Sequence, residues 1–99
     1  MSDELSDLRL FTKMVSAGSL SETARRLNSS LTAMSRRLSQ MEQRLGVRLI
    51  DRGSRRFSLT EEGELLFECG MGIIAEIEEV EAEVSAKVRT PKGRLRVRV

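Results

Sequence analysis

The strongest constraint on the fold of this chain is an apolar stripe in residues 30–45. Its members recur at alternating intervals of three and four residues: Leu31, Met34, Leu38, Met41 and Leu45. This spacing lines up one side of an α-helix, so the segment predicts an amphipathic helix packed against the rest of the domain. Gly46 follows the last member and is typical of a helix C-terminus.

The opposite side of this helix carries no carboxylate. It is formed by Thr32, Arg36, Ser39, Gln40 and Gln43, with Ser35 and Arg37 at the flanks. Hydroxyl, amide and guanidinium groups can bind base edges and phosphates, so the pattern points to nucleic acid. An ordinary amphipathic helix with a solvated polar face would look the same, and this segment alone leaves both interpretations open.

Two shorter helices are predicted before it. Residues 4–17 have an apolar face and end at Gly18, which tolerates the left-handed conformation. Ser19 and Glu22 form a capping-box pattern, in which the Glu22 side chain reaches back, for a helix over about residues 20–28. A turn at residues 28–30 then leads to the stripe helix, with Ser30 as its N-cap.

A short helix, a tight turn and a longer helix together predict a helix-turn-helix over about residues 20–45. In such a unit the second helix enters the major groove and the first crosses the DNA backbone. A plain three-helix bundle is the alternative, and the absence of carboxylates from the outer face argues against it.

A small β-hairpin is predicted next, over about residues 47–59. Two β-prone runs, 47–50 and 55–59, are separated by Asp51-Arg52-Gly53-Ser54. Arg52, Arg55 and Arg56 would lie at its tip, where a wing could grip phosphates or the minor groove. A solvated turn is the bland alternative.

The rest of the chain predicts a long helix over about residues 61–90, which Thr60 caps. It carries a narrow apolar seam close to a heptad repeat: Leu66, Ile73, Ile77, Val80 and Val84. A helix of about 45 Å is too long for so small a domain to cover, so the seam predicts a homodimer. Residues 93–99 alternate as in a β-strand, and we expect a second domain to start within residues 91–99.

Charge is segregated along the chain. Residues 1–60 have a net charge of +5, residues 61–90 of −7 and residues 91–99 of +4. The basic first part is therefore the part expected to meet a polyanion. The chain has no histidine, which argues against catalytic triads and zinc sites, and only one cysteine, so no intrachain disulfide is possible. We expect no catalysis, no metal, no cofactor, no membrane span and a cytoplasmic location.

The sequence resembles the N-terminal part of LysR-type bacterial transcriptional regulators. The matching motifs are Leu8-x-x-Phe11, Gly18-Ser19-Leu20, Ala24-x-x-Leu27, Ala33-Met34-Ser35-Arg36, Met41-Glu42-x-x-Leu45-Gly46-Val47-x-Leu49, Arg52, Arg55-Arg56 and Leu59-Thr60-x-x-Gly63. Gly93-Arg94-Leu95 looks like the start of the effector-binding domain of that family. The motifs are specific only in combination, and the resemblance covers nearly the whole chain.

The resemblance implies a mostly α winged helix-turn-helix over residues 3–60, followed by a dimerising linker helix. It further implies a partly palindromic site on double-stranded DNA and a co-inducer bound only through a C-terminal domain. Further association of the dimer in the full-length protein stays open. The DNA-binding positions carried over from the family would be Leu31, Thr32, Ser35, Arg36, Arg52, Arg55 and Arg56. The polar face of the helix adds Ser39 to the expected DNA-binding residues.

The sequence departs from the family pattern at the start of the recognition helix. Leu31 and Thr32 stand where the family usually has glutamine and proline, so base preference should differ. Leu31 could touch only a thymine methyl group. Two alternatives to this function stay open: a winged-helix regulator without an effector domain, and a dimeric scaffold that binds no specific DNA.

Overall fold

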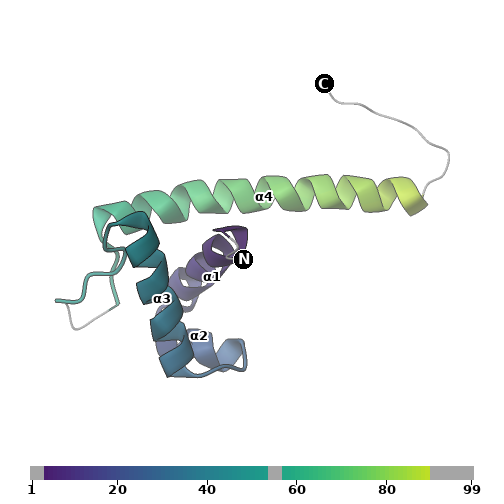
Figure 1. Ribbon diagram of the computed structural model, residues 1–99. Helices are drawn as coiled ribbons and strands as arrows, with labels where there is room; N and C mark the ends of the chain where they lie inside the picture. Colours follow the sequence, from purple (N-terminus) through teal and green to yellow (C-terminus); the bar gives the residue numbers. More distant parts are fainter. Residues whose placement is uncertain (1–3, 54–56, 90–99) are drawn as a thin grey trace.

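The computed structural model describes residues 4–53 and 57–89, which form a small helical domain with one long projecting helix (Figure 1). Four helices follow one another: α1 (Glu4–Ala17), α2 (Leu20–Arg26), α3 (Leu31–Leu45) and α4 (Glu61–Arg89). The first three pack together, and α4 crosses α1 and continues beyond the domain. The mostly α winged helix-turn-helix with a long final helix, predicted from the sequence, is confirmed.

The helix ends follow the capping residues of the sequence. Gly18 and Gly46 both adopt positive φ values, 85° and 75°, directly after α1 and α3. The side-chain oxygen of Ser19 accepts from the Glu22 N–H, and that of Ser30 accepts from the Ala33 N–H, each at 3.0 Å. These local signals explain why most helix starts and ends could be predicted to within a residue or two.

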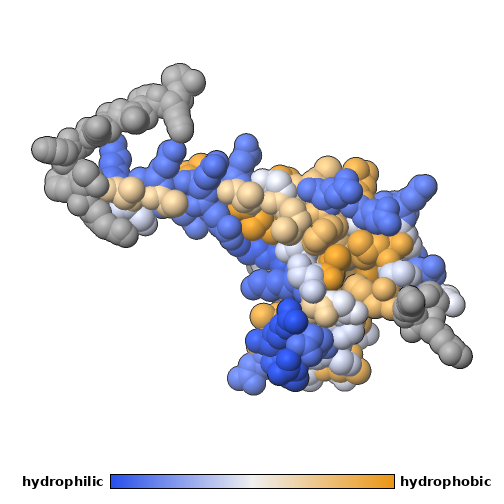
Figure 2. Space-filling view, turned by 180° about the vertical axis from the view of Figure 1, so that it is seen from behind, coloured by the Kyte–Doolittle hydropathy of each residue, from blue (hydrophilic) through white to orange (hydrophobic). Residues whose placement is uncertain are grey.

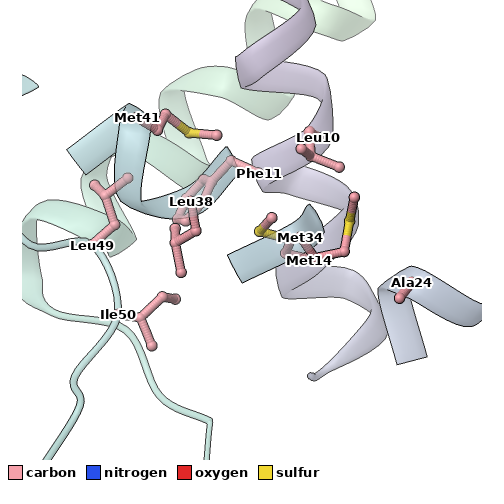
Figure 3. Packing of buried hydrophobic residues seen from close by; sticks show 9 residues of the cluster. All are labelled: Leu10, Phe11, Met14, Ala24, Met34, Leu38, Met41, Leu49 and Ile50. Carbon is pink, nitrogen blue, oxygen red and sulfur yellow. The ribbon is translucent and has the colours of Figure 1, made fainter. Parts of the chain in front are cut away.

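The core is formed where α1, α2 and α3 meet the segment that follows α3 (Figure 3). Its fully buried apolar members come from three elements: Phe11 and Met14 from α1, Leu38 and Met41 from α3, and Leu49 after it. The inner part of the predicted stripe is therefore confirmed. Its two ends are not buried, because Leu31 and Leu45 stay 52% and 41% exposed.

The wing segment is paired by a single antiparallel bridge among the described residues, between Ile50 and Leu59. Backbone hydrogen bonds from Asp51 N–H to Ser58 O and from Thr60 N–H to Leu49 O flank it at 2.9 and 3.0 Å. The described residues therefore include the base of the predicted hairpin. The tip residues 54–56, and with them Arg55 and Arg56, lie outside the described residues, as do residues 91–99.

Helix α4 is attached to the domain along its first half. Thr60 caps it, since its Oγ1 accepts from the Gly63 N–H at 2.9 Å and donates to Arg48 O at 2.7 Å. Gly70 is buried against α1, where a Cβ would come within 2.7 Å of Leu8 Cδ1. Arg9 of α1 reaches Glu78 at 3.8 Å, and residues 79–87 are all exposed beyond this point.

Helix α2 ends at Arg26, two residues before the predicted end, and Asn28 turns the chain with a φ of 59°. One prediction about α2 is wrong. The Glu22 side chain does not complete a capping box, because its carboxylate oxygens accept from Arg25 and Arg26 instead. Two guanidinium groups one turn away compete better for a carboxylate than one backbone N–H does.

Candidate nucleic-acid interface

The outward face of α3 is the centre of the candidate interface. The predicted contact residues of α3 lie within residues 31–39 and are all exposed: Leu31, Thr32, Ser35, Arg36 and Ser39. Gln40 and Gln43 extend the same polar surface towards the C-terminus and are exposed too. The burial of Met34, Leu38 and Met41 fixes this rotation of the helix, because these side chains occupy the opposite side.

The three arginines of α3 have separate roles. Arg37 and Arg44 stand seven residues apart on one flank, and both donate to the Asp7 carboxylate of α1 at 3.2 Å. They fasten α3 to α1 and are partly neutralised there. Arg36 points to the outward face, and no described residue forms an ion pair with it.

The one acidic residue of α3, Glu42, is turned into the domain on the other flank. Its Oε2 accepts from the backbone N–H groups of Leu49 and Ile50 at 2.8 and 3.2 Å. Its Oε1 accepts from Arg52 at 2.5 Å and lies 3.9 Å from Arg48. A carboxylate that DNA would repel is therefore withdrawn from the outward face, and its charge is balanced by two arginines.

Arg52 is consequently not a free basic group at the wing. Its side chain is 40% exposed, and its guanidinium keeps further N–H donors besides the one that binds Glu42. Its bond to Glu42 brings it to the α3 flank that carries Ser35. Its predicted role in DNA binding stays a prediction, as do those of Arg55 and Arg56.

A second basic group, which the sequence patterns did not reveal, lies at the end of α2. Arg25 and Arg26 both bind Glu22, and their side chains remain 72% and 56% exposed. The strongly hydrophilic patch at the bottom of Figure 2 lies at this end of the molecule. Hydrogen bonds from Arg25 and Arg26 lower the pKa of Glu22 from 4.5 to about 2. The sequence signal that could have revealed this group is the pair of basic residues at the end of the first helix of the helix-turn-helix.

The predicted dimerisation seam of α4 divides into two parts. Leu66 and Ile77 are half-buried, and Leu66 packs against the core of its own domain. Ile73, Val80 and Val84 are 47%, 59% and 58% exposed. Apolar side chains thus continue along α4 past the last contact with α1, where they alternate with hydrophilic residues, mostly glutamates (Figure 2).

Among residues 4–53 and 57–89, no group of three or more histidine, cysteine, aspartate or glutamate side chains is arranged to hold a metal ion. No helix within the same residues is both long and apolar enough to cross a membrane.

Comparison with known proteins gives a consistent family. Residues 5–64 match the model of the bacterial regulatory helix-turn-helix proteins of the lysR family. An HTH-type transcriptional repressor of Pseudomonas aeruginosa is 39% identical over 95 residues, which are 96% of this chain and 30% of that protein. The HTH-type transcriptional regulator CrgA of Neisseria meningitidis is 38% identical over 91 residues, which are 92% of this chain. The chain spans about 30% of the length of these relatives.

Solved structures agree with this family. The DNA-binding domain of BenM, in complex with a catB site DNA, superposes with a TM-score of 0.83 over 95% of this chain and all of that chain. At 23% identity this likeness concerns the fold alone. DarR of Vibrio fischeri, solved in complex with DNA, is 27% identical with a TM-score of 0.76, covering 90% of this chain and 30% of that one.

Proposed function

Because the chain belongs to the LysR family of bacterial regulatory helix-turn-helix proteins, we propose that it binds double-stranded DNA in a sequence-dependent manner, as a homodimer, to regulate transcription. The relatives are transcriptional regulators and not enzymes, and the proposal assigns no catalytic step. Such a protein would act on bacterial DNA in the cytoplasm.

The observation that carries this proposal is the sorting of charge on α3. The outward face holds hydroxyls, amides and Arg36, which no described residue pairs with, whereas the only carboxylate of the helix, Glu42, is 8% exposed and faces the wing. A face that is merely solvated has no reason to exclude carboxylates. A face that meets phosphates and base edges does, because each carboxylate there would repel the DNA.

We assign a role to each part of the chain. Residues 3–60 form the DNA-binding domain, residues 61–90 the dimerisation helix, and residues 91–99 the start of an effector-binding domain. In the first part, Leu31, Thr32, Ser35, Arg36 and Ser39 would face the major groove, with Arg52, Arg55 and Arg56 at the wing. A co-inducer, where one acts, would bind a C-terminal domain of the LysR type.

The dimer is supported by the exposed half of α4. Val80 and Val84 lie beyond the contact with α1, and they are 59% and 58% exposed. The seam of Ile73, Ile77, Val80 and Val84, with Leu66 at its edge, could be covered by the same surface of a second copy, which is how most homodimers assemble. Two copies of α3 would then address two half-sites of a partly palindromic sequence.

The dependence of DNA affinity on salt tests this function. Phosphate binding releases counterions, so the logarithm of the association constant should fall linearly with the logarithm of salt, by about 0.9 per phosphate contacted. The measurement uses a duplex selected from random sequence and a second duplex of scrambled sequence. Tighter binding to the selected duplex with a steep slope is expected. A flat salt dependence and equal, weak binding to both would instead favour the scaffold alternative.

A further inference from the structure

We propose that Glu42 is a positioning residue for DNA binding, which locks the wing to the recognition helix through Arg52. This inference rests on the proposed function and adds a residue that touches no DNA itself. One buried carboxylate would then align the outward face of α3 with the wing.

Glu42 lies on one of the two flanks by which α3 is fastened to the rest of the domain. At about 100° per residue, Glu42 lies on the flank that also bears Ser35, whereas Arg37 and Arg44 lie on the opposite flank. The Arg37 and Arg44 flank is fastened to α1 through Asp7. The Glu42 flank is fastened to the segment after α3. The outward face of α3 lies between these two fastened flanks.

The hydrogen bonds of Glu42 connect α3 to the base of the wing and to Arg52. The two oxygens of its carboxylate are used separately: one binds the backbone of Leu49 and Ile50, where the wing begins, and the other binds the Arg52 guanidinium. Ile50 is also the residue that forms the bridge to Leu59. One side chain therefore fixes both the backbone at the base of the wing and an arginine beside it.

The negative charge of Glu42 distinguishes a positioning role from simple repulsion of DNA. An acidic residue close to bound DNA should weaken binding, and its neutralisation should strengthen it. If Glu42 positions the wing, the opposite follows, since loss of its charge releases Arg52 and lets the wing drift. The two expectations differ in sign, which makes the proposal testable.

The test compares Glu42→Gln with Glu68→Gln in the 99-residue chain. Glu68 is exposed on α4, and the two variants change the net charge equally. The glutamine at position 42 can still accept from Leu49 and Ile50 through its carbonyl oxygen, but its NH₂ group would face Arg52. We expect Glu42→Gln to bind a selected and a scrambled duplex about five- to tenfold more weakly, with a log-log salt slope lower by about two per dimer. Glu68→Gln should bind as the unaltered chain does.

A second variant keeps the proposal testable if Glu42→Gln is too unstable. Arg52→Ala leaves both backbone bonds of Glu42 in place, and it should reproduce the loss of affinity and slope. In the double variant the two losses should not add, because they remove one interaction. Binding that is unchanged or tighter in Glu42→Gln, or losses that add, would overturn the proposal. Failure of the unaltered chain and of Glu68→Gln to bind DNA would count against the proposed function instead.

Discussion

A Cβ atom on Gly63 would lie 2.1 Å from the carbonyl oxygen of Leu49. Gly63 stands in the first turn of α4, and Leu49 stands at the base of the wing, so the long helix leaves the domain in direct backbone contact with the wing. The Thr60 N–H donates to the same Leu49 oxygen at 3.0 Å. The direction of α4 is therefore set by the backbone of the DNA-binding domain.

Gly63→Ala should destabilise the domain because the clash involves backbone and cannot be relieved by a side-chain rotation. We expect a loss of about 1–3 kcal/mol in the free energy of unfolding, measured by denaturant titration. Gly72→Ala is the matched control, since a methyl group at that position would meet no atom within 4 Å. It should stabilise α4 by about 1 kcal/mol through helix propensity. Equal effects of the two substitutions would contradict the contact between Gly63 and Leu49.

The dimer should depend on the exposed half of the seam. Val84→Lys places a charge there without disturbing the contacts between α4 and α1, because Val84 lies beyond them. We expect a monomer with unchanged helix content in sedimentation and circular dichroism. Ala82→Lys adds the same charge to another side of the exposed half of α4, and it should leave the dimer intact. A dimer that survives Val84→Lys would remove the seam from the proposed assembly.

The stability of α2 at low pH should depend on the ionised carboxylate of Glu22. Its pKa in the folded chain is lowered from 4.5 to about 2 by Arg25 and Arg26. A lowered pKa means that the stabilisation is complete above about 4.5 and is lost as the pH falls towards 2. The carboxyl carbon resonance of Glu22 should titrate with a midpoint near 2 in the NMR spectrum. Substitution of both arginines by alanine should return the midpoint towards 4.5, and a midpoint already near 4.5 in the unaltered chain would contradict the ion cluster.

The helices could be predicted because their signals are local. Ser19, Ser30 and Thr60 cap the N-termini of α2, α3 and α4, and Gly18 and Gly46 end α1 and α3. An apolar stripe at helical spacing fixes the inward side of α3. The burial of Glu42 could not be predicted in the same way. Its partners Leu49, Ile50 and Arg52 are brought to it by tertiary structure, and a glutamate on an amphipathic helix is ordinarily solvated.

The same distinction explains what was predicted at the candidate interface. The outward placement of Thr32, Arg36 and Ser39 follows from the spacing of the stripe alone. The sequence did not reveal that Arg37 and Arg44 bind Asp7, because Asp7 lies thirty residues or more away along the chain. It also did not reveal that the carboxylate of Glu22 serves two arginines rather than the helix N-terminus.

The proposed function requires that the outward face of α3 contacts DNA, and Arg36→Ala tests this contact. Arg37→Ala is the matched control, since it removes a neighbouring arginine that binds Asp7 instead. Affinities would be measured at one salt concentration, on a selected duplex and on its single-base variants.

Arg36→Ala should weaken binding to the selected duplex by about 1–3 kcal/mol if the arginine reads a base, with discrimination lost at one position in each half-site. An equal loss on every variant would make Arg36 a phosphate contact on the same face. Arg37→Ala should lower the stability of the fold and leave base preference unchanged. If Arg36→Ala binds every duplex as tightly as the unaltered chain, the outward face of α3 does not meet DNA and the proposed function is contradicted.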